Sequence, residues 1–306
     1  EIVTASVDEA RRRDIMKNHT ATHLLHSVLR EILGQHATQA GSYVGPDRLR
    51  FDFMHPKALD SEEIRRIEKR VNEHIDRNDT AKPTEMSREE SRKQGAIAFF
   101  GEKYGEQVRV LSISDYSKEL CGGTHVSSTG TIDFFWIVSE GSIGSGIRRI
   151  EALTGSEAYR RGEGCEETIK KIAISLGLIP EGPIPSDIRP LETLKGSEAY
   201  QRAKQCEEIV KKFARSLKVA EEQVVEAIKN LRTQSKDESE EPKDNVKGKK
   251  DEFFSMIGEK VLRKVEHLQT QVEKERQDLK KSKKEEMRRY VEETVIKRLK
   301  TISLRR

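Results

Sequence analysis

The sequence has few of the residues that build a hydrophobic core. Apolar residues (alanine and cysteine included) make up 34% of its 306 positions and aromatic residues only 5%, whereas 36% of the positions are charged. A chain of this length is expected to form one large domain or two small ones. Because so little apolar surface is available, we expect part of the chain to form exposed helix or not to fold alone.

Cysteine is scarce too, and the three cysteines at 121, 165 and 206 are an odd number. This argues against a disulfide framework and for a reducing compartment. No apolar run approaches the ~20 residues of a membrane span, and no signal-peptide pattern opens the chain. We therefore expect a cytoplasmic piece of a longer protein, without membrane contact. The net charge of +4 excludes a histone-like polycation and leaves only local patches for nucleic-acid binding.

The first 150 residues alternate between helical and strand-like patterns. Helices are predicted over Asn18–Gly34, from Asp60 or Ser61 to about Ile75, and over Arg88–Gly95. Strands are predicted on both sides of a turn at 45–47 and over Val108–Ile113, Gly130–Val138 and Ile147–Leu153, with a glycine-rich loop at 141–146. This order predicts an α+β domain with a mostly antiparallel sheet over residues 1–152.

An internal duplication follows this domain. Residues 153–178 and 194–219 are identical at 15 of 26 positions at an offset of 41, and each copy has a helical pattern. We predict a duplicated helical region over residues 153–232. Residues 233–250 contain one apolar residue, Val246, and are predicted to be a disordered linker.

Residues 251–306 are predicted to form a coiled-coil arm. Their apolar residues follow an interrupted spacing of about 3.5 residues, at Val261, Val265, Leu268, Val272, Leu279, Val291, Val295, Leu299 and Ile302. A lone helix would leave this seam in water. We therefore expect it to form a homodimer with a second chain or to pack back on residues 155–230.

The sharpest feature is a pair of histidines, His19 and His23, four residues apart on the first predicted helix, so that they share one face. A second pair, Cys121 and His125, encloses two glycines that allow a tight turn. Together they form a nitrogen and sulfur set that favours tetrahedral Zn²⁺. The alternative for the first pair alone is a helix with two unrelated histidines, but the second pair is independent of it and favours the metal.

Four motifs in this order resemble the editing region of alanyl-tRNA synthetase. They are NHTATHLLH at 18–26, LRFDF at 49–53, LCGGTH at 120–125 and GIRRIEALTG at 146–155. The resemblance covers about residues 1–160. The related editing domain of threonyl-tRNA synthetase also pairs HxxxH with CxxxH, but the string NHTATHLLH and the residues between Cys121 and His125 favour the alanyl type.

The resemblance implies a zinc-dependent deacylase that removes serine or glycine wrongly attached to tRNA(Ala), the proofreading step of an ATP-dependent alanine ligase. It implies His19, His23, Cys121 and His125 as zinc ligands, Gln39 and Cys121 as catalytic residues, and Thr22, Gln39, Gly144 and Arg148 as substrate-binding residues. Gln39 would read the hydroxyl of serine, the loop of Gly144 would admit the terminal adenosine, and Arg148 would touch phosphate. Each has a plainer alternative: a surface amide, a strand-connecting turn and a paired arginine.

Two other functions fit the same residues. One is a free-standing protein that edits in trans, and the other is a non-catalytic, zinc-stabilised module that binds tRNA. The motifs of an aminoacylation core are missing from the sequence. If all four ligands bind, the zinc shell is closed and other polar groups must position the water. If Cys121 is held loosely, a zinc-bound water becomes possible.

Overall fold

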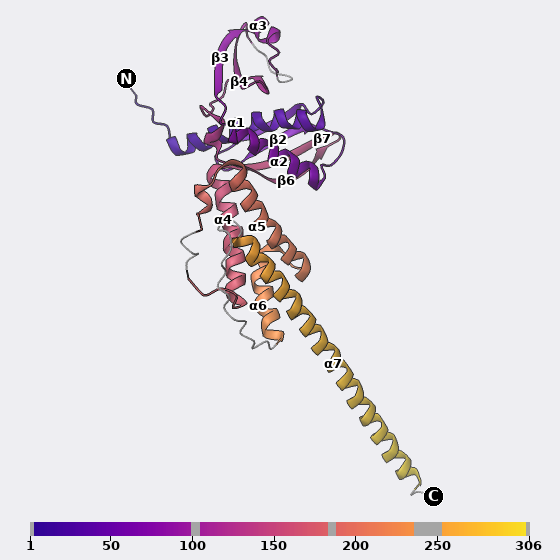
Figure 1. Ribbon diagram of the computed structural model, residues 1–306. Helices are drawn as coiled ribbons and strands as arrows, with labels where there is room; N and C mark the ends of the chain where they lie inside the picture. Colours follow the sequence, from indigo (N-terminus) through magenta and orange to yellow (C-terminus); the bar gives the residue numbers. More distant parts are fainter. Residues whose placement is uncertain (1–2, 99–104, 183–187, 236–252, 304–306) are drawn as a thin grey trace. The chain divides into compact units, whose positions relative to one another are not determined.

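The computed structural model describes residues 3–98, 105–182, 188–235 and 253–303, and these form an α+β structure with antiparallel sheets (Figure 1). The helices are α1 (Glu9–Leu33), α2 (Ser61–Asp76), α3 (Arg88–Lys93), α4 (Gly155–Ser175), α5 (Gly196–Leu217), α6 (Val224–Ser235) and α7 (Phe253–Ser303). The strands are β1 (Gln39–Val44), β2 (Leu49–Met54), β3 (Ala81–Ser87), β4 (Gln107–Ile113), β5 (Ser117–Leu120), β6 (Phe135–Gly144) and β7 (Ile147–Thr154). Three short 3-10 turns, η1 (Thr129–Ile132), η2 (Leu191–Thr193) and η3 (Glu221–Gln223), lie between them.

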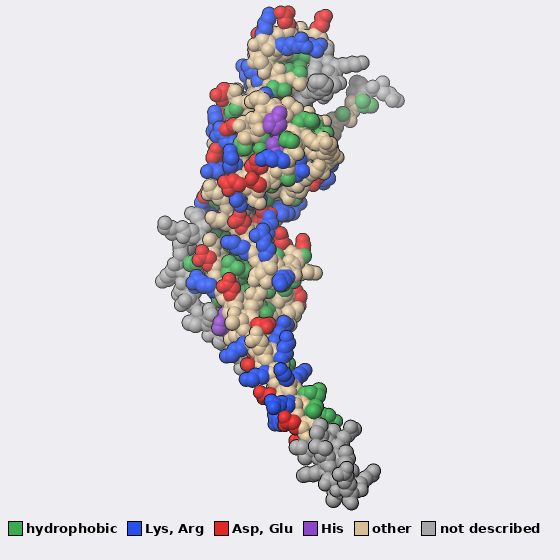
Figure 2. Space-filling view, turned by 90° about the vertical axis from the view of Figure 1, so that its right-hand side faces the viewer, with side chains coloured by type: hydrophobic (Ala, Val, Ile, Leu, Met, Phe, Trp, Pro, Cys, Tyr) green, Lys and Arg blue, Asp and Glu red, His purple; other side chains and the backbone are tan. Residues whose placement is uncertain are grey.

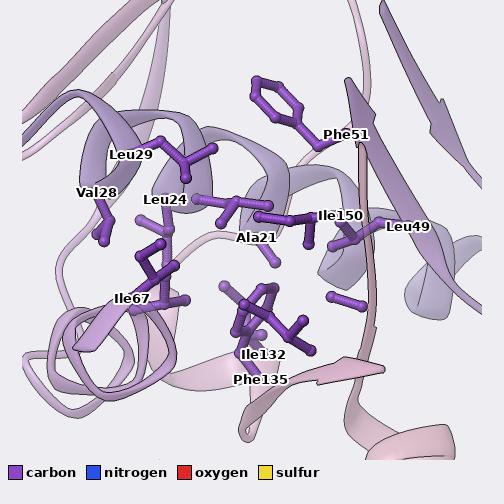
Figure 3. Close-up of a cluster of buried hydrophobic side chains, with 14 of the residues drawn as sticks. Ala21, Leu24, Val28, Leu29, Leu49, Phe51, Ile67, Ile132, Phe135 and Ile150 are labelled. Carbon is purple, nitrogen blue, oxygen red and sulfur yellow. The ribbon is translucent and has the colours of Figure 1, made fainter. Parts of the chain in front are cut away.

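A four-stranded antiparallel sheet in the order β1-β2-β7-β6 carries the main core. Helices α1 and α2 lie against it (Figure 1). Leu24 and Leu29 of α1 meet Phe51 of β2, Ile150 of β7 and Ile67 of α2 in one fully buried cluster (Figure 3). This core therefore attaches α1, the helix on which His19 and His23 lie, to the sheet.

Helix α1 begins at Glu9, nine residues before the predicted start. The side chain of Asp8 caps this end by accepting a hydrogen bond from the Arg11 amide. The first turns are mostly exposed and have no apolar stripe, so periodicity alone could not find them. The helix ends at Gly34 with a φ of 113°, a backbone angle that favours glycine.

The second sheet, β3-β4-β5, is antiparallel as well. Strands β3 and β5 were not predicted, because β3 is mostly exposed and has a proline inside it, while β5 has only four residues. Proline is tolerated in β3 because this is an edge strand. The importance of this sheet is that β5 leads directly into Cys121.

The predicted strand over Gly130–Val138 is wrong in its first half. Residues 129–132 form the turn η1, and Asp133 has a φ of 72° that ends the turn before β6 begins at Phe135. The predicted glycine-rich loop is also shorter, since β6 continues to Gly144 and forms a hairpin with β7. Several closely spaced glycines predict a loop, because the sequence does not show that these residues form backbone hydrogen bonds with the neighbouring strand.

The two copies of the duplication form helices α4 and α5, which begin at Gly155 and Gly196 with φ angles of 51° and 49°. The compact units do not follow the predicted boundary at residue 152. The first unit contains residues 1–165 and 189–205, and the second contains residues 166–188 and 206–306. In the first unit, equivalent residues of both copies surround the buried rings of Phe134 and Trp136. The start of each copy thus belongs to the core of the first unit.

In the second unit, α7 packs back against α6 through its first half. Phe254, Ile257, Val261, Val265 and Leu268 are buried there, which agrees with one of the two alternatives for the seam. Farther along, apolar side chains at Leu279, Met287, Tyr290 and Val291 are exposed. The predicted linker is helical at 233–235, and its remainder lies outside the described residues. None of the helices that the structure describes is long and apolar enough to cross a membrane.

Candidate metal centre

The four predicted ligands converge on one point. His19 and His23 come from the middle of α1, whereas Cys121 and His125 come from the loop after β5. One ligand atom from each of the four lies within 4.8 Å of the others. His23 is buried, and the other three are half-buried; Figure 2 shows histidine side chains reaching the surface on one face. The cluster is therefore both enclosed by the core and open to a ligand.

The Nε2 atoms of His19 and His125 lie near the Cys121 sulfur, and the Nε2 atom of His23 has no hydrogen-bond partner among the described residues. The Cys121 Sγ atom is 3.2 Å from His125 Nε2 and 3.5 Å from His19 Nε2. The Nδ1 atom of His23 contacts Glu119 Oε2 at 2.6 Å, and its buried Nε2 has no hydrogen-bond partner among the described residues. A buried ring nitrogen without a hydrogen-bond partner, lying beside a thiol, fits the role of a metal ligand.

The loop between Cys121 and His125 is fixed from both sides. The Cys121 amide donates to the carbonyl of Arg109, and the Arg109 guanidinium donates to the carbonyl of Gly123. After the loop, the Val126 amide donates to Thr20 Oγ1 on α1 at 3.2 Å. The loop also needs a glycine at 123, because a Cβ there would lie 2.0 Å from the His19 ring. Backbone and helix together hold the second ligand pair against the first.

The electrostatics of the cluster favour a thiolate. Burial on its own raises the pKa of Cys121, but hydrogen bonds from His125 and His19 outweigh it and lower the pKa to about 3. Burial lowers the pKa of His125 to about 4, so this ring is neutral at pH 7. Burial on its own lowers the pKa of His23, but the neighbouring Glu119 carboxylate raises it. The two side chains form a buried ion pair. A thiolate and imidazoles are the forms that bind metal.

The donor set fits zinc better than a hard cation. Three imidazole nitrogens and one sulfur match the ligands of tetrahedral zinc sites, whose bonds of about 2.0–2.3 Å place neighbouring ligand atoms about 3.3–3.8 Å apart. The measured Sγ–Nε2 separations of 3.2 and 3.5 Å lie near this range. Magnesium and calcium take oxygen ligands, and carboxylate oxygen is absent from this set of four.

Gln39 and Arg148 lie in one row of the four-stranded sheet. Gln39 pairs with Phe53, and Phe53 pairs with Arg148, so the three side chains project to the same face. This is the face against which α1 packs, because Phe53 belongs to the core. Gln39 is half-buried and its amide donates to Ser42 Oγ at 3.3 Å. The register therefore brings Gln39 to the side of the sheet that carries the cluster, although no contact joins the two.

Of the other three predicted substrate-binding residues, Thr22 and Arg148 have partners within the protein, and Gly144 has open space where a side chain would lie. Arg148 forms a two-bond ion pair with Glu140, and both side chains are largely buried. Thr22 is buried on α1 and donates to the Asn18 carbonyl at 2.8 Å. Gly144 lies at the end of β6, and a Cβ there would meet nothing within 4 Å. Arg148 is thus paired with Glu140 in this structure, and steric crowding does not require a glycine at 144.

Two residues that sequence reasoning did not assign lie beside the cluster. Glu119, two residues before Cys121, contacts both His23 and His26. His26 shares the α1 face with the two ligands because it follows His23 by three residues, and its ring lies 5.4 Å from that of Phe51. The alternation of β5 gave no sign that Glu119 points inward, since a charged residue in a short strand is usually exposed.

Residues 108–151, which contain Cys121 and His125, match the family model of the second additional domain of threonyl- and alanyl-tRNA synthetases. The alanine–tRNA ligase of Desulforamulus reducens is 52% identical over 171 residues, which are 56% of this chain and 20% of that ligase. That of Chloroflexus aurantiacus is 50% identical over 190 residues, 58% of this chain and 21% of the ligase.

The similarity lies in the N-terminal half, which contains the cluster. This half of the chain is homologous to a segment of alanine–tRNA ligases, and the resemblance inferred from the motifs is confirmed there. The chain spans about a fifth of the length of the curated relatives it matches.

Proposed function

From this homology and from the converging ligands, we propose that the chain contains a zinc-dependent editing centre, which hydrolyses tRNA(Ala) esterified with serine or glycine. The observation that carries the proposal is the convergence of His19, His23, Cys121 and His125 on one point, in the half of the chain related to alanine–tRNA ligases. In a full ligase this hydrolysis would proofread the ATP-dependent attachment of alanine. We also propose a cytoplasmic location, where tRNA is charged.

The chemistry of the substrates explains the need for such a centre. A pocket that holds the methyl group of alanine cannot strongly reject glycine, which is smaller, or serine, whose hydroxyl it can accommodate. One binding step discriminates by only about 10–200-fold, which is too little for translation. A second site that recognises the serine hydroxyl by a hydrogen bond adds the missing selectivity.

The proposed metal supplies a fixed positive charge and, for any oxygen that enters its coordination shell, a Lewis acid. With four side-chain ligands the shell is closed, so the chain's other polar groups must orient the ester and the attacking water. An aminoacyl ester is already activated, and modest positioning of this kind suffices. Cys121 contributes the anionic ligand, and in this sense we assign it to the catalytic centre.

We assign the recognition of the amino acid to Gln39. Its amide can donate to and accept from a hydroxyl, and its side chain is half-buried on the face of the sheet that α1 covers. Thr22 and Gly144 remain proposed substrate contacts. Arg148 uses two of its five N–H donors on Glu140, so we expect the remaining donors to contact a phosphate of the substrate while this ion pair is kept.

Replacing Gln39 with alanine tests the recognition step. We expect hydrolysis of seryl-tRNA(Ala) to slow by about 5–30-fold, which corresponds to one hydrogen bond of about 1–2 kcal/mol. Hydrolysis of glycyl-tRNA(Ala) should change little, because glycine has no hydroxyl. The measurement is the deacylation rate of both esters at saturating protein.

The matched control is Gln35→Ala, which removes a nearby glutamine whose partner is Arg30. It should leave both rates unchanged. Equal slowing of the two esters by Gln39→Ala would contradict hydroxyl recognition and would show that Gln39 acts on the shape of the pocket or on water.

The proposed partner besides tRNA is a second copy of the chain. The apolar side chains of Leu279, Met287, Tyr290 and Val291 are exposed, while the earlier part of the α7 seam is buried in the second unit. Pairing of two such helices would cover these side chains. The homodimer and the coiled coil stay predictions.

A further inference from the structure

Glu119 is a buried carboxylate that two histidines share. Its side chain is 2% exposed, and its two oxygens lie 2.6 Å from His23 Nδ1 and 2.9 Å from His26 Nδ1. Both histidines are buried as well, at 3% and 1% exposure. A carboxylate in such a place costs free energy unless each oxygen is hydrogen-bonded. The two imidazoles meet this requirement.

This arrangement fixes the tautomer of His23. An ionised carboxylate can only accept hydrogen bonds, so the Nδ1 atoms of both rings must carry the proton. Each oxygen of Glu119 lies at hydrogen-bond distance from one Nδ1 atom, so one carboxylate orients both rings. The unprotonated position of a neutral His23 ring is then Nε2, the atom that the cluster needs as a ligand.

His26 holds the carboxylate from the side away from the cluster. It follows His23 by three residues and therefore lies on the same face of α1, and its ring packs near Phe51 of β2. Glu119 itself stands on β5, two residues before Cys121. One carboxylate thus ties the helix that supplies His19 and His23 to the strand that leads to the other two ligands.

We propose that Glu119, held by His26, is the positioning residue of the metal centre. It contacts His23 Nδ1 and so orients the ring with Nε2 toward the ion. Hydrogen bonds of this kind from a ligand imidazole to a carboxylate typically change metal affinity by about 10–100-fold. The inference rests on the proposed function, because it requires that the cluster binds zinc.

The test is the zinc affinity of the full chain, measured by competition with a chromophoric chelator, together with the absorption spectrum of the cobalt-loaded protein. For Glu119→Gln we expect zinc affinity to fall about 10–100-fold and the cobalt bands to shift, while the far-UV circular dichroism is retained. The amide has a single acceptor oxygen, so it cannot accept from both rings as they stand.

The matched control is Glu68→Gln. Glu68 is equally buried, at 1% exposure, but its partners are Lys204, Tyr200 and the Ile137 amide. This variant should lower thermal stability without changing zinc affinity or the cobalt spectrum. If Glu119→Gln fails to fold, His26→Gln decides instead, with an expected loss of affinity in the same direction and of smaller size.

The outcomes separate the two proposals. If the wild-type chain binds no zinc, the proposed metal centre itself is wrong. If the wild-type chain binds zinc and Glu119→Gln (or His26→Gln in its place) binds it equally well with an unshifted cobalt spectrum, the positioning role of Glu119 is overturned and the metal centre stands. A loss of affinity in Glu68→Gln as large as that in Glu119→Gln would also overturn it, since it would reflect a general loss of stability.

Discussion

Replacing Cys121 with alanine is expected to abolish stoichiometric zinc binding and to slow the hydrolysis of seryl-tRNA(Ala) by more than about a hundredfold. The thiolate is the only anionic ligand of the cluster. Without it, three neutral imidazoles must hold a doubly charged ion, and the loss should exceed the 10–100-fold typical of residues that only support a ligand. Elemental analysis of the purified chain and single-turnover deacylation measure the two effects.

The control for this variant is Cys165→Ala, which removes a cysteine on α4 that is not part of the cluster. This control should still bind about one zinc per chain. Circular dichroism should show the same helix content in Cys121→Ala as in the wild type, because none of the cluster residues lies on α4 to α7. A Cys121→Ala variant that retains one tightly bound zinc would contradict the ligand assignment.

The second large effect is expected from Gly123→Ala. A Cβ at this position would lie 2.0 Å from Cε1 and 2.5 Å from Nδ1 of His19. One of the two must move, and the side chain that moves is itself a proposed ligand. We expect zinc affinity to fall by at least about tenfold, comparable to the loss of a supporting contact, and deacylation to fall with it.

The neighbouring glycine provides a close control. A Cβ at Gly122 would meet nothing within 4 Å, so Gly122→Ala should leave zinc affinity and deacylation near wild type. Isothermal titration of the metal-free variants with zinc compares the two directly. Equal affinities for Gly122→Ala and Gly123→Ala would show that the loop does not hold His19 in the way the structure describes.

The metal cluster was predictable from the sequence, because its information is local. Spacings of four residues place His19 beside His23 on a helix, and two glycines let Cys121 approach His125. The sequence does not show that the two pairs, 98 positions apart, meet. That expectation rests on their common preference for one metal ion. The structure adds that one ligand atom from each lies within 4.8 Å of the others.

The residues that support the cluster could not be found in the same way. Glu119 meets His23 across 96 positions of sequence, and nothing in the short strand β5 marks it as buried. Arg148 is similar, since its partner Glu140 lies across the hairpin. Such contacts depend on strand register, which the hydrophobic pattern fixes only when the whole sheet is known.

In the helical half of the chain, too, the sequence predicted the helices but not how they are divided between the compact units. The duplication predicted two helices, and both are present. The division into compact units was not predictable, because the residues that attach each helix start to the first unit, such as Ala158 and Ala199 around Trp136, are identical in the two copies. Likewise, the periodicity of α7 does not distinguish its buried first half from residues 273–293, which are exposed.

One measurement tests the central claim most directly. It is the rate at which the zinc-loaded wild-type chain hydrolyses seryl-tRNA(Ala) and glycyl-tRNA(Ala), compared with alanyl-tRNA(Ala) under the same conditions. An editing centre predicts that the seryl and glycyl esters are cleaved well above their spontaneous rates, whereas the alanyl ester is spared. If the zinc-loaded chain binds these tRNAs but cleaves none of the esters faster than buffer does, the chain contains a zinc-stabilised tRNA-binding module and the proposed deacylase is wrong.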